Sequence, residues 1–373
     1  MTASNPFITS GYLSPHYFCD RVEETKQLTT LVTNGNNVAL ISPCRLGKTG
    51  LIHHTFQQEA FSDHYYTFIV DIYATKNLQE LVYELGKTVL GTLKSRGRKT
   101  WEMFLNALGS LRSSISFDIN GNPEWGLGIG DIKVPESTLD EIFSYLEQAD
   151  RPCVVAIDEF QVIADYPEKN VEAVLRTRIQ RCNNARFIFA GSQRHMMSEL
   201  FLSPSRPFYQ STSLMSITPI AMEHYVMFAR ELFSEYGKAI TPEAVARAYS
   251  RYEGVTWYVQ SILNALFALT PTGHTCTEEM IEPAIKQVID QQSFAYKALL
   301  FQLPPKQKEV LMAIAREGRA TNLTARPFLQ RHHLTASMVQ AAVKGLLEKD
   351  FITLDLGTYM LYDQFFAQWL LQQ

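Results

Sequence analysis

Short apolar runs alternate with longer helical patterns through the first half of the chain. Each run is bounded by polar or turn residues, as buried parallel strands are. Such alternation is typical of a parallel sheet with crossover helices, so we predict an α/β fold here. Strands are expected at 37–41, 67–72, 153–157, 186–190 and 214–217, and helices at 48–61, 78–93, 138–147 and 171–182.

Beyond Met222 the pattern becomes nearly all helical. Four helical stretches predict a compact lid, and the break at Leu303-Pro304-Pro305 opens a last segment of three helices and a hairpin through Gly357, the order of a winged helix. The lid helices are expected at 223–236, 242–252, 258–269 and 278–291, and those of the last segment at 306–317, 327–330 and 336–348.

These patterns predict three domains. We expect an ATPase core at 1–220, a helical lid at 221–302 and a winged helix at 303–373. A hairpin insertion is expected near 113–131, because Asn120-Gly121 supplies the backbone angles of a tight turn. Its glycines follow no strand-to-helix junction, so a structural hairpin is favoured over a nucleotide loop.

Composition adds the class of protein. The chain has 373 residues, of which 46% are hydrophobic and 19% charged, as in a soluble globular protein, and its net charge of -4 argues against a wholesale nucleic-acid coat. The five scattered cysteines form no CxxC pair, which favours reduced thiols in a cytoplasm. We find no signal peptide in residues 1–20 and no uninterrupted run of 18 apolar residues, so no membrane partner is expected.

The strongest chemical signal is Gly47-Lys48-Thr49, which follows an apolar strand and a loop and opens a helix. In such a P-loop, backbone N–H groups point at phosphates, the lysine reaches the β- and γ-oxygens, and the threonine hydroxyl holds Mg²⁺. Ser42 stands where the pattern GxxxxGK[ST] has its first glycine. The residues expected to contact the nucleotide are Ser42, Pro43, Cys44, Arg45, Leu46, Gly47, Lys48, Thr49 and Gly50.

Two further strands end in polar residues. Asp158 and Glu159 close one of them, and we expect Asp158 to hold Mg²⁺ with Thr49 while Glu159 orients and deprotonates the attacking water. Ser192 follows another strand, whose tip should lie between these two motifs. Ser192 is therefore a candidate to hydrogen-bond the γ-phosphate or the water, with a plain turn as the alternative.

With the lid and winged helix, these motifs resemble the AAA+-like archaeal-type ATPase family, which is related to the STAND NTPases. The segment from Tyr17 to Glu24 is similar to the family's Arg-Glu segment, and the resemblance implies adenine contacts at Phe18 and Arg21. Two other segments resemble the family's lid motif and closing segment, although each lacks the usual proline: Gly254-Val-Thr-Trp-Tyr258 and Tyr362-Asp-Gln-Phe-Phe-Ala-Gln-Trp369.

The resemblance also implies an arginine near the γ-phosphate, which would stabilise charge in the transition state. Arg206 matches the family position best, and a solvated surface arginine is the alternative. Other candidates lie on the preceding helix at Arg176, Arg178 and Arg181. No clear lid arginine appears, and Arg251 is merely the nearest.

The winged helix leaves its partner open. Residues 305–373 carry eight basic and six acidic side chains, a balance of +2. For double-stranded DNA, Gln340 and Lys344 would face the groove, while Arg326, Arg331 and His332 would grip phosphates. The alternative is a protein contact, self-association or an autoinhibitory role.

Two functions follow. The first is an Mg²⁺-dependent ATPase in which ATP binding and hydrolysis switch the lid and winged helix relative to the core. The second is a STAND-type signalling scaffold that holds ATP or ADP with negligible turnover until a protein partner binds. A small-molecule kinase is disfavoured, because no acceptor pocket is visible in the sequence.

Overall fold

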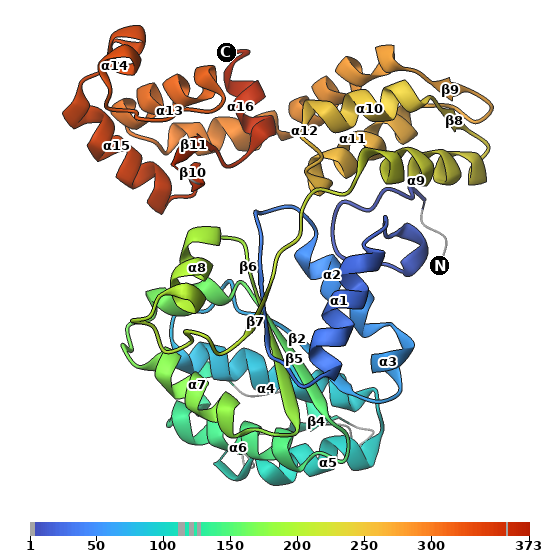
Figure 1. Cartoon of the computed structure of the whole chain (residues 1–373), viewed down its shortest axis with the longest axis vertical. Helices are drawn as coiled ribbons and strands as arrows, with labels where there is room; N and C mark the ends of the chain where they lie inside the picture. The colour runs from blue at the N-terminus through green and yellow to red at the C-terminus, as the bar shows by residue number, and fades with distance from the viewer. Residues whose placement is uncertain (1–3, 111–115, 119–122, 125–127, 356) are drawn as a thin grey trace. The chain divides into compact units, whose positions relative to one another are not determined.

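The computed structural model describes residues 4–110, 116–118, 123–124, 128–355 and 357–373. Its contacts form two compact units, one of Ser10–Ile220 and the other of Met1–Thr9 with Ala221–Gln373 (Figure 1). The division at residue 220 coincides with the expected end of the core. The first residues, however, group with the second unit, although we expected them in the core.

The core contains a sheet of five parallel strands in the order β2-β5-β6-β1-β7. This confirms the predicted α/β fold and parallel sheet. Strands β1 and β5 are buried along their whole length, which explains their continuous apolar sequences. The bounds are β1 Val38–Ile41, β2 Tyr66–Asp71, β5 Cys153–Asp158, β6 Ala185–Gly191 and β7 Ser213–Met215.

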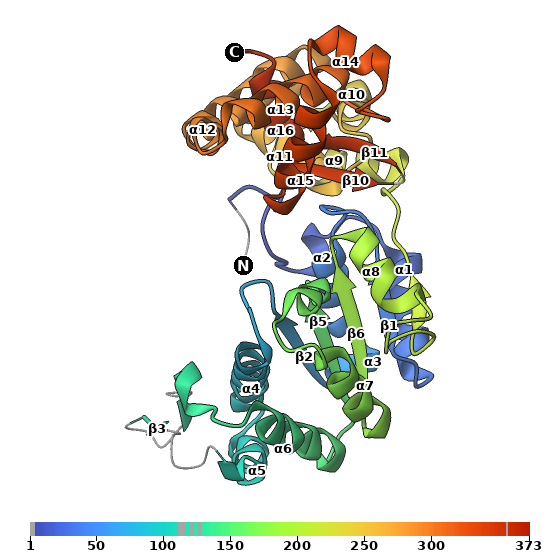
Figure 2. The same ribbon diagram turned by 90° about the vertical axis from the view of Figure 1, so that its left-hand side faces the viewer.

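Helices cover both faces of this sheet. The first three lie on one side, and α4 to α7 lie on the other, where they share one apolar cluster with the strands (Figures 1 and 2). The bounds are α1 Val22–Thr33, α2 Lys48–Phe56, α3 Glu59–Ser62, α4 Leu78–Lys94, α5 Arg98–Ala107, α6 Pro135–Gln148, α7 Val171–Arg181 and α8 Arg194–Leu202.

The helix expected at 48–61 is wrong in its second half. It ends at Phe56, and the extended backbone of Gln58 separates α2 from α3. This break lets the buried Phe61 ring pack 5.7 Å from Phe56 and 5.3 Å from Tyr65. Burial of Phe61 against these rings therefore overrides the local helical pattern.

The insertion contains a short antiparallel pair, β3 Ser116–Phe117 with β4 Pro123–Glu124. Its expected turn at Asn120-Gly121 lies outside the described residues. We did not predict the core helices α1, α5 and α8, of which α5 and α8 bury residues such as Phe104 and Phe201 in the core cluster.

The second unit begins with the lid. Residues 4–9 pack on it, because Phe7 is fully buried among the rings of Phe228, Phe233 and Phe267. The lid also contains a short parallel strand pair that we did not predict. The bounds are α9 Met222–Glu235, β8 Ala239–Ile240, α10 Pro242–Arg251, α11 Thr256–Leu269, β9 Thr275–Cys276 and α12 Ile281–Phe301.

The last segment has the predicted three helices and hairpin, followed by one further helix. Ala320 forms an antiparallel bridge with Tyr359 beside the hairpin. This arrangement confirms the predicted winged helix. The bounds are α13 Pro305–Glu317, α14 Arg326–His332, α15 Ala336–Glu348, β10 Ile352–Asp355, β11 Thr358–Leu361 and α16 Gln364–Leu370.

Aromatic side chains join the lid to the winged helix within this unit. Phe365 of α16 is fully buried, with its ring 4.9 Å from Tyr258, 5.2 Å from Tyr252 and 5.6 Å from Trp257. The Tyr258 hydroxyl accepts from the backbone N–H of Gln364 at 2.8 Å. The two segments that resemble the family's lid and closing motifs are therefore the two sides of one joint.

Phe365→Ala should destabilise this unit by about 3–5 kcal/mol, because it leaves a cavity among three rings. Thermal unfolding of the full chain measures the loss. Phe294→Ala is a matched control, since the Phe294 side chain is largely exposed and should change the melting temperature little. Equal melting temperatures for the two variants would contradict the proposed joint.

Candidate nucleotide site

The three predicted motifs meet at one edge of the sheet. Strand β6 lies between β5 and β1, so Ser192 follows a strand flanked by those that lead to Glu159 and to the P-loop. The carboxyl ends of neighbouring parallel strands form the usual ligand site of such sheets. The strand order thus agrees with the expectation that the Ser192 tip is the middle one.

The P-loop has the backbone that its sequence requires. Gly47 has φ 90° and caps α2, and Arg45 is also left-handed at φ 64°. The buried Lys48 Nζ donates to the carbonyl oxygens of Ser42 at 3.0 Å and Pro43 at 2.9 Å. Among the residues that the structure describes, the buried Ser42 Oγ finds no hydrogen-bond partner, so the serine in place of glycine fits the loop without contributing a bond to it.

Arg21 is hydrogen-bonded to the backbone of the P-loop. Its side chain is only 2% exposed, and Nη2 donates to the Leu46 carbonyl oxygen at 3.0 Å. Nη1 donates to the Thr218 carbonyl oxygen and to Glu24 Oε1, both at 2.6 Å. These bonds occupy the guanidinium with protein oxygens, whereas an adenine contact for Arg21 stays a prediction.

Phe18 lies against the first turns of α2. Its ring stacks on His54 with centroids 4.5 Å apart, and a Cβ at Gly50 would lie 3.2 Å from Phe18 Cε2. A side chain at Gly50 would therefore crowd the ring. This close approach is the structural reason for a glycine after Thr49.

The P-loop and the acidic strand end are linked directly. Thr49 Oγ1 donates to Asp158 Oδ2 at 2.5 Å. The other oxygen, Asp158 Oδ1, accepts from the backbone N–H of Glu159 at 3.0 Å. A hydroxyl and a carboxylate oxygen side by side are the hard ligands that Mg²⁺ prefers, so the donor set fits this ion.

Glu159 is held by two side chains, one of which the sequence analysis missed. Its Oε2 accepts from Ser192 Oγ and from Gln161 Nε2, each at 2.6 Å. Gln161 is buried, and a Cβ at Gly191 would lie 2.3 Å from its Oε1. The small residue at the end of β6 therefore makes room for Gln161. A glutamine two residues beyond Glu159 was the available signal.

Burial disfavours the charged forms of both Lys48 and Asp158. It lowers the pKa of Lys48, although the negative fields of Glu159 and Asp158 raise it again. Burial likewise raises the pKa of the Asp158 carboxyl, against the lowering effect of the bond from Thr49. The site is therefore electrostatically costly in the folded chain, as sites that bind charged ligands often are.

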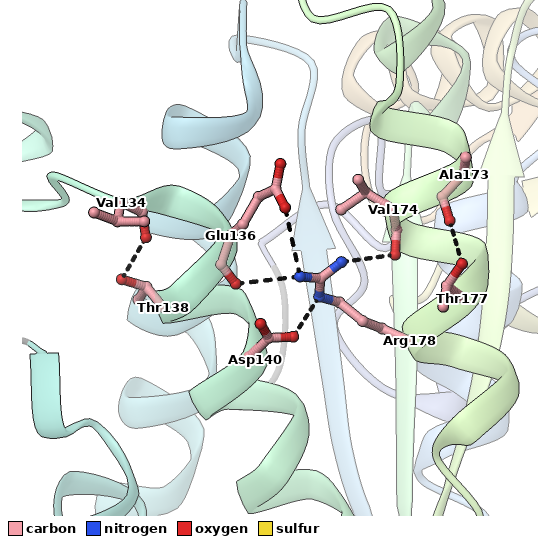
Figure 3. A network of polar contacts seen from close by, with 8 residues as sticks. All are labelled: Val134, Glu136, Thr138, Asp140, Ala173, Val174, Thr177 and Arg178. Carbon is pink, nitrogen blue, oxygen red and sulfur yellow. Dashed lines mark hydrogen bonds and ion pairs between the residues drawn. The ribbon is translucent and has the colours of Figure 1, made fainter.

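The arginine candidates of the core make their described ion pairs and hydrogen bonds with other residues than these. Arg206 forms ion pairs with Glu172, at 2.8 Å, and with Glu199. Arg178 ties α7 to α6, because Nε donates to Asp140 Oδ1 at 2.7 Å and Nη2 lies 3.9 Å from Glu136 Oε2 (Figure 3). These bonds give Arg178 a structural role, whereas a finger role for Arg206 stays a prediction.

For the other two arginines of α7 and for Arg251 in the lid, the structure describes no ion pair. Arg176 Nε is buried and has no hydrogen-bond partner in the described part of the chain, and Arg181 and Arg251 are exposed. Neither arginine of α7 makes a described contact with Lys48, Asp158 or Glu159.

Several basic groups of the winged helix are paired with carboxylates. Glu317 Oε1 accepts from Arg331 Nη1 at 2.5 Å and lies 2.8 Å from His332 Nε2. On α15, the exposed Lys344 lies 3.9 Å from Glu348. Gln340 is also exposed on that helix, and Arg326 is exposed at the start of α14. Pairing lowers the net positive charge that this surface offers to phosphates.

The fold and the site together define an ATP-binding P-loop ATPase of the AAA+-like type. Residues 18–262 match the family described as an ATPase domain predominantly from Archaea, and residues 294–372 match a probable winged helix domain. The chain belongs to this family of archaeal-type ATPase domains. Comparison with curated proteins by sequence finds no match.

Solved structures share the whole architecture. The Walker-type ATPase PABY2304 of Pyrococcus abyssi superposes with a TM-score of 0.66 at 17% identity, covering 98% of this chain and 99% of that one. The Aeropyrum pernix ORC2 protein, in its ADPNP-ADP complexes, gives 0.59 at 14% identity, with coverage of 98% and 95%. The Aeropyrum pernix ORC1 protein in complex with DNA gives 0.55 at 12% identity, with coverage of 99% and 97%. At these identities the likeness shows the fold alone.

Among the residues that the structure describes, we find no helix with both the length and the apolar character needed to cross a bilayer.

Asp158→Asn should stabilise the nucleotide-free chain at pH 8. A carboxyl whose pKa rises on folding costs stability once the pH exceeds that raised pKa, and the cost vanishes below the unfolded value. Asparagine can still accept from Thr49. Melting temperatures at pH 8 and pH 4 test this: the advantage of the variant should shrink toward pH 4. A variant that melts below wild type at pH 8 would show that the charge itself stabilises the site.

Proposed function

We propose that this chain binds ATP with Mg²⁺ and hydrolyses it, using Lys48, Thr49, Asp158 and Glu159. The observation that carries the proposal is the 2.5 Å bond between Thr49 Oγ1 and Asp158 Oδ2 at the start of a P-loop helix. It brings a phosphate-binding loop and a carboxylate pair to one place. The family and the fold both support nucleotide binding.

The loop would bind the phosphates through the backbone N–H groups of 42–50 and through Lys48. Lys48 Nζ now donates to two loop carbonyls, so binding requires it to exchange these oxygens for phosphate oxygens. Thr49 and Asp158 would hold Mg²⁺, which neutralises phosphate charge when bound. Phe18, beside Gly50, is the residue that we propose for contact with the base.

Glu159 is the proposed general base. Ser192 and Gln161 both donate to the same oxygen, Oε2, and so fix the orientation of the carboxylate. Within the described part of the chain no side chain donates to Glu159 Oε1, which is therefore the oxygen that we propose to accept a proton from water. Ser192 would then act as a positioning residue for Glu159 and could also meet the γ-phosphate.

Hydrolysis would drive a switch of the second unit relative to the core. The lid and winged helix share the aromatic joint around Phe365, which supports their moving as one body. The chain passes between the units at Thr9–Ser10 and again at Ile220–Ala221, so two connections would carry the movement.

A signalling scaffold with negligible turnover is the second candidate. The two hydrogen bonds to Glu159 favour it, because they hold Oε2 of this carboxylate on Ser192 and Gln161 rather than on a water. In this case a protein partner would release Glu159. Single-turnover hydrolysis by the purified chain separates the candidates: rapid release of phosphate supports the ATPase, and retained, intact ATP supports the scaffold.

The charge pairing on the winged helix favours a protein, rather than double-stranded DNA, as the partner of the α15 surface. Lys344 and Arg331 each face a carboxylate, so few charges remain to displace counterions from DNA. The likeness to the ORC1 protein in complex with DNA keeps a DNA link as the alternative. Retention of a duplex by the purified chain at low salt would favour that alternative.

Lys48→Ala should abolish measurable ATP binding and leave the fold intact, because this lysine is the one side-chain cation that the P-loop aims at the phosphates. Isothermal titration measures the affinity. Lys94→Ala, which removes an exposed lysine of the same unit, is the control and should bind as wild type does. Wild-type affinity in Lys48→Ala would refute the P-loop assignment.

Glu159→Gln should bind ATP normally and hydrolyse it roughly 10²–10⁴ times more slowly, the usual contribution of a positioned base. Glutamine preserves an oxygen that can accept from Ser192 and Gln161. Release of phosphate at saturating ATP measures turnover, with Glu59→Gln on the exposed side of α3 as the control. Unchanged turnover in Glu159→Gln would place the base elsewhere.

A further inference from the structure

The outer face of the last turns of α12 exposes two aromatic rings. Phe294 is 85% and Phe301 84% exposed. Seven residues make about two helical turns, so both rings lie on the same face, with Lys297 and Ala298 between them. Large apolar side chains gathered in this way on a surface mark an interaction site.

The opposite face of the same turns is firmly anchored. The ring of the buried Tyr296 lies 5.2 Å from Phe366 and 5.9 Å from Trp369. Trp369 Nε1 also donates to Ser293 Oγ at 3.1 Å. The two phenylalanines are therefore presented on a rigid helix rather than on a loop.

Lysines outnumber acidic residues beside these rings, where the exposed Asp290, four residues before Phe294, is the nearest carboxylate along α12. The sequence from 291 to 308 contains three lysines, Lys297, Lys306 and Lys308, and no aspartate or glutamate. Lys308 Nζ lies 5.8 Å from the centroid of the Phe301 ring, at the start of α13. This aromatic–lysine face, defined as Phe294, Lys297, Phe301, Lys306 and Lys308, thus differs from the charge-paired surface of α15.

We propose that the aromatic–lysine face binds single-stranded nucleic acid. Bases would stack on Phe294 and Phe301, and the lysines would contact the phosphates. A duplex keeps its bases stacked inside, so exposed rings recognise single strands better. Protein interfaces are depleted in lysine, which makes a protein partner the less suitable occupant. The proposal goes beyond the ATPase reaction and does not depend on it.

The test uses the full chain without nucleotide and a fluorescein-labelled 20-residue oligo(dT) at low ionic strength. Fluorescence anisotropy should show binding, with a log-affinity against log-salt slope of roughly −2 for about three phosphate contacts to a single strand. Phe294→Ala with Phe301→Ala should weaken binding by about tenfold or more, the usual effect of losing stacking. Because both rings are exposed, this variant should fold, and its melting temperature checks that it does.

Two matched variants separate the face from other surfaces. Tyr73→Ala removes another exposed ring, on the core, and should leave binding unchanged, as should Lys344→Ala on α15. No binding of oligo(dT), or equal binding by the Phe294 and Phe301 double variant, would overturn the proposal. So would tighter binding of a 20-base-pair duplex that depends on Lys344. A double variant that instead dissociates a self-associated wild type would identify the face as a protein contact and also overturn the proposal.

Discussion

The hydrogen bond from Thr49 to Asp158 connects two segments that are 109 residues apart in the chain. It can form only because parallel strands end at the same edge and β5 lies two places from β1 in the sheet. Everything at the candidate site depends on that order. Lys48 and Asp158 are both buried where these strands end. Ser192, which follows the strand β6 between β5 and β1, donates to Glu159.

Hydrogen bonds between buried polar groups fix the side chains of this site. Arg21 donates to the carbonyl oxygens of Thr218 and of Leu46 in the P-loop, and Lys48 donates to two further carbonyl oxygens of that loop. Without such partners these charges would be too costly to bury. The lysine and the carboxylate pair are therefore organised by the protein alone, and a ligand has to compete with internal bonds for each of them.

Aromatic packing fixes the segments of the second unit to one another, whereas strand order brings the functional residues of the core together. Phe7 and Phe365 are both fully buried among rings, one fixing residues 4–9 to the lid and the other fixing the winged helix to it. Such contacts are dense and specific, so they favour a body that moves as a whole. The exposed Phe294 and Phe301 differ from this pattern, because Tyr296 on the same helix is buried.

Local patterns in the sequence were sufficient for the strands of the core sheet, the P-loop and the winged helix. A run such as that before Asp158 is apolar throughout because both of its faces are buried, and Gly47 has the positive φ that a P-loop needs. Tertiary contacts decided the rest. Gln161 became a partner of Glu159 only where Gly191 left it space, and Arg178 became a structural link because α6 brought two carboxylates to it. The sequence alone determined which groups carry charge and where the chain can bend, whereas the packing of distant segments determined which of those groups meet, since that depends on burial and not on local spacing.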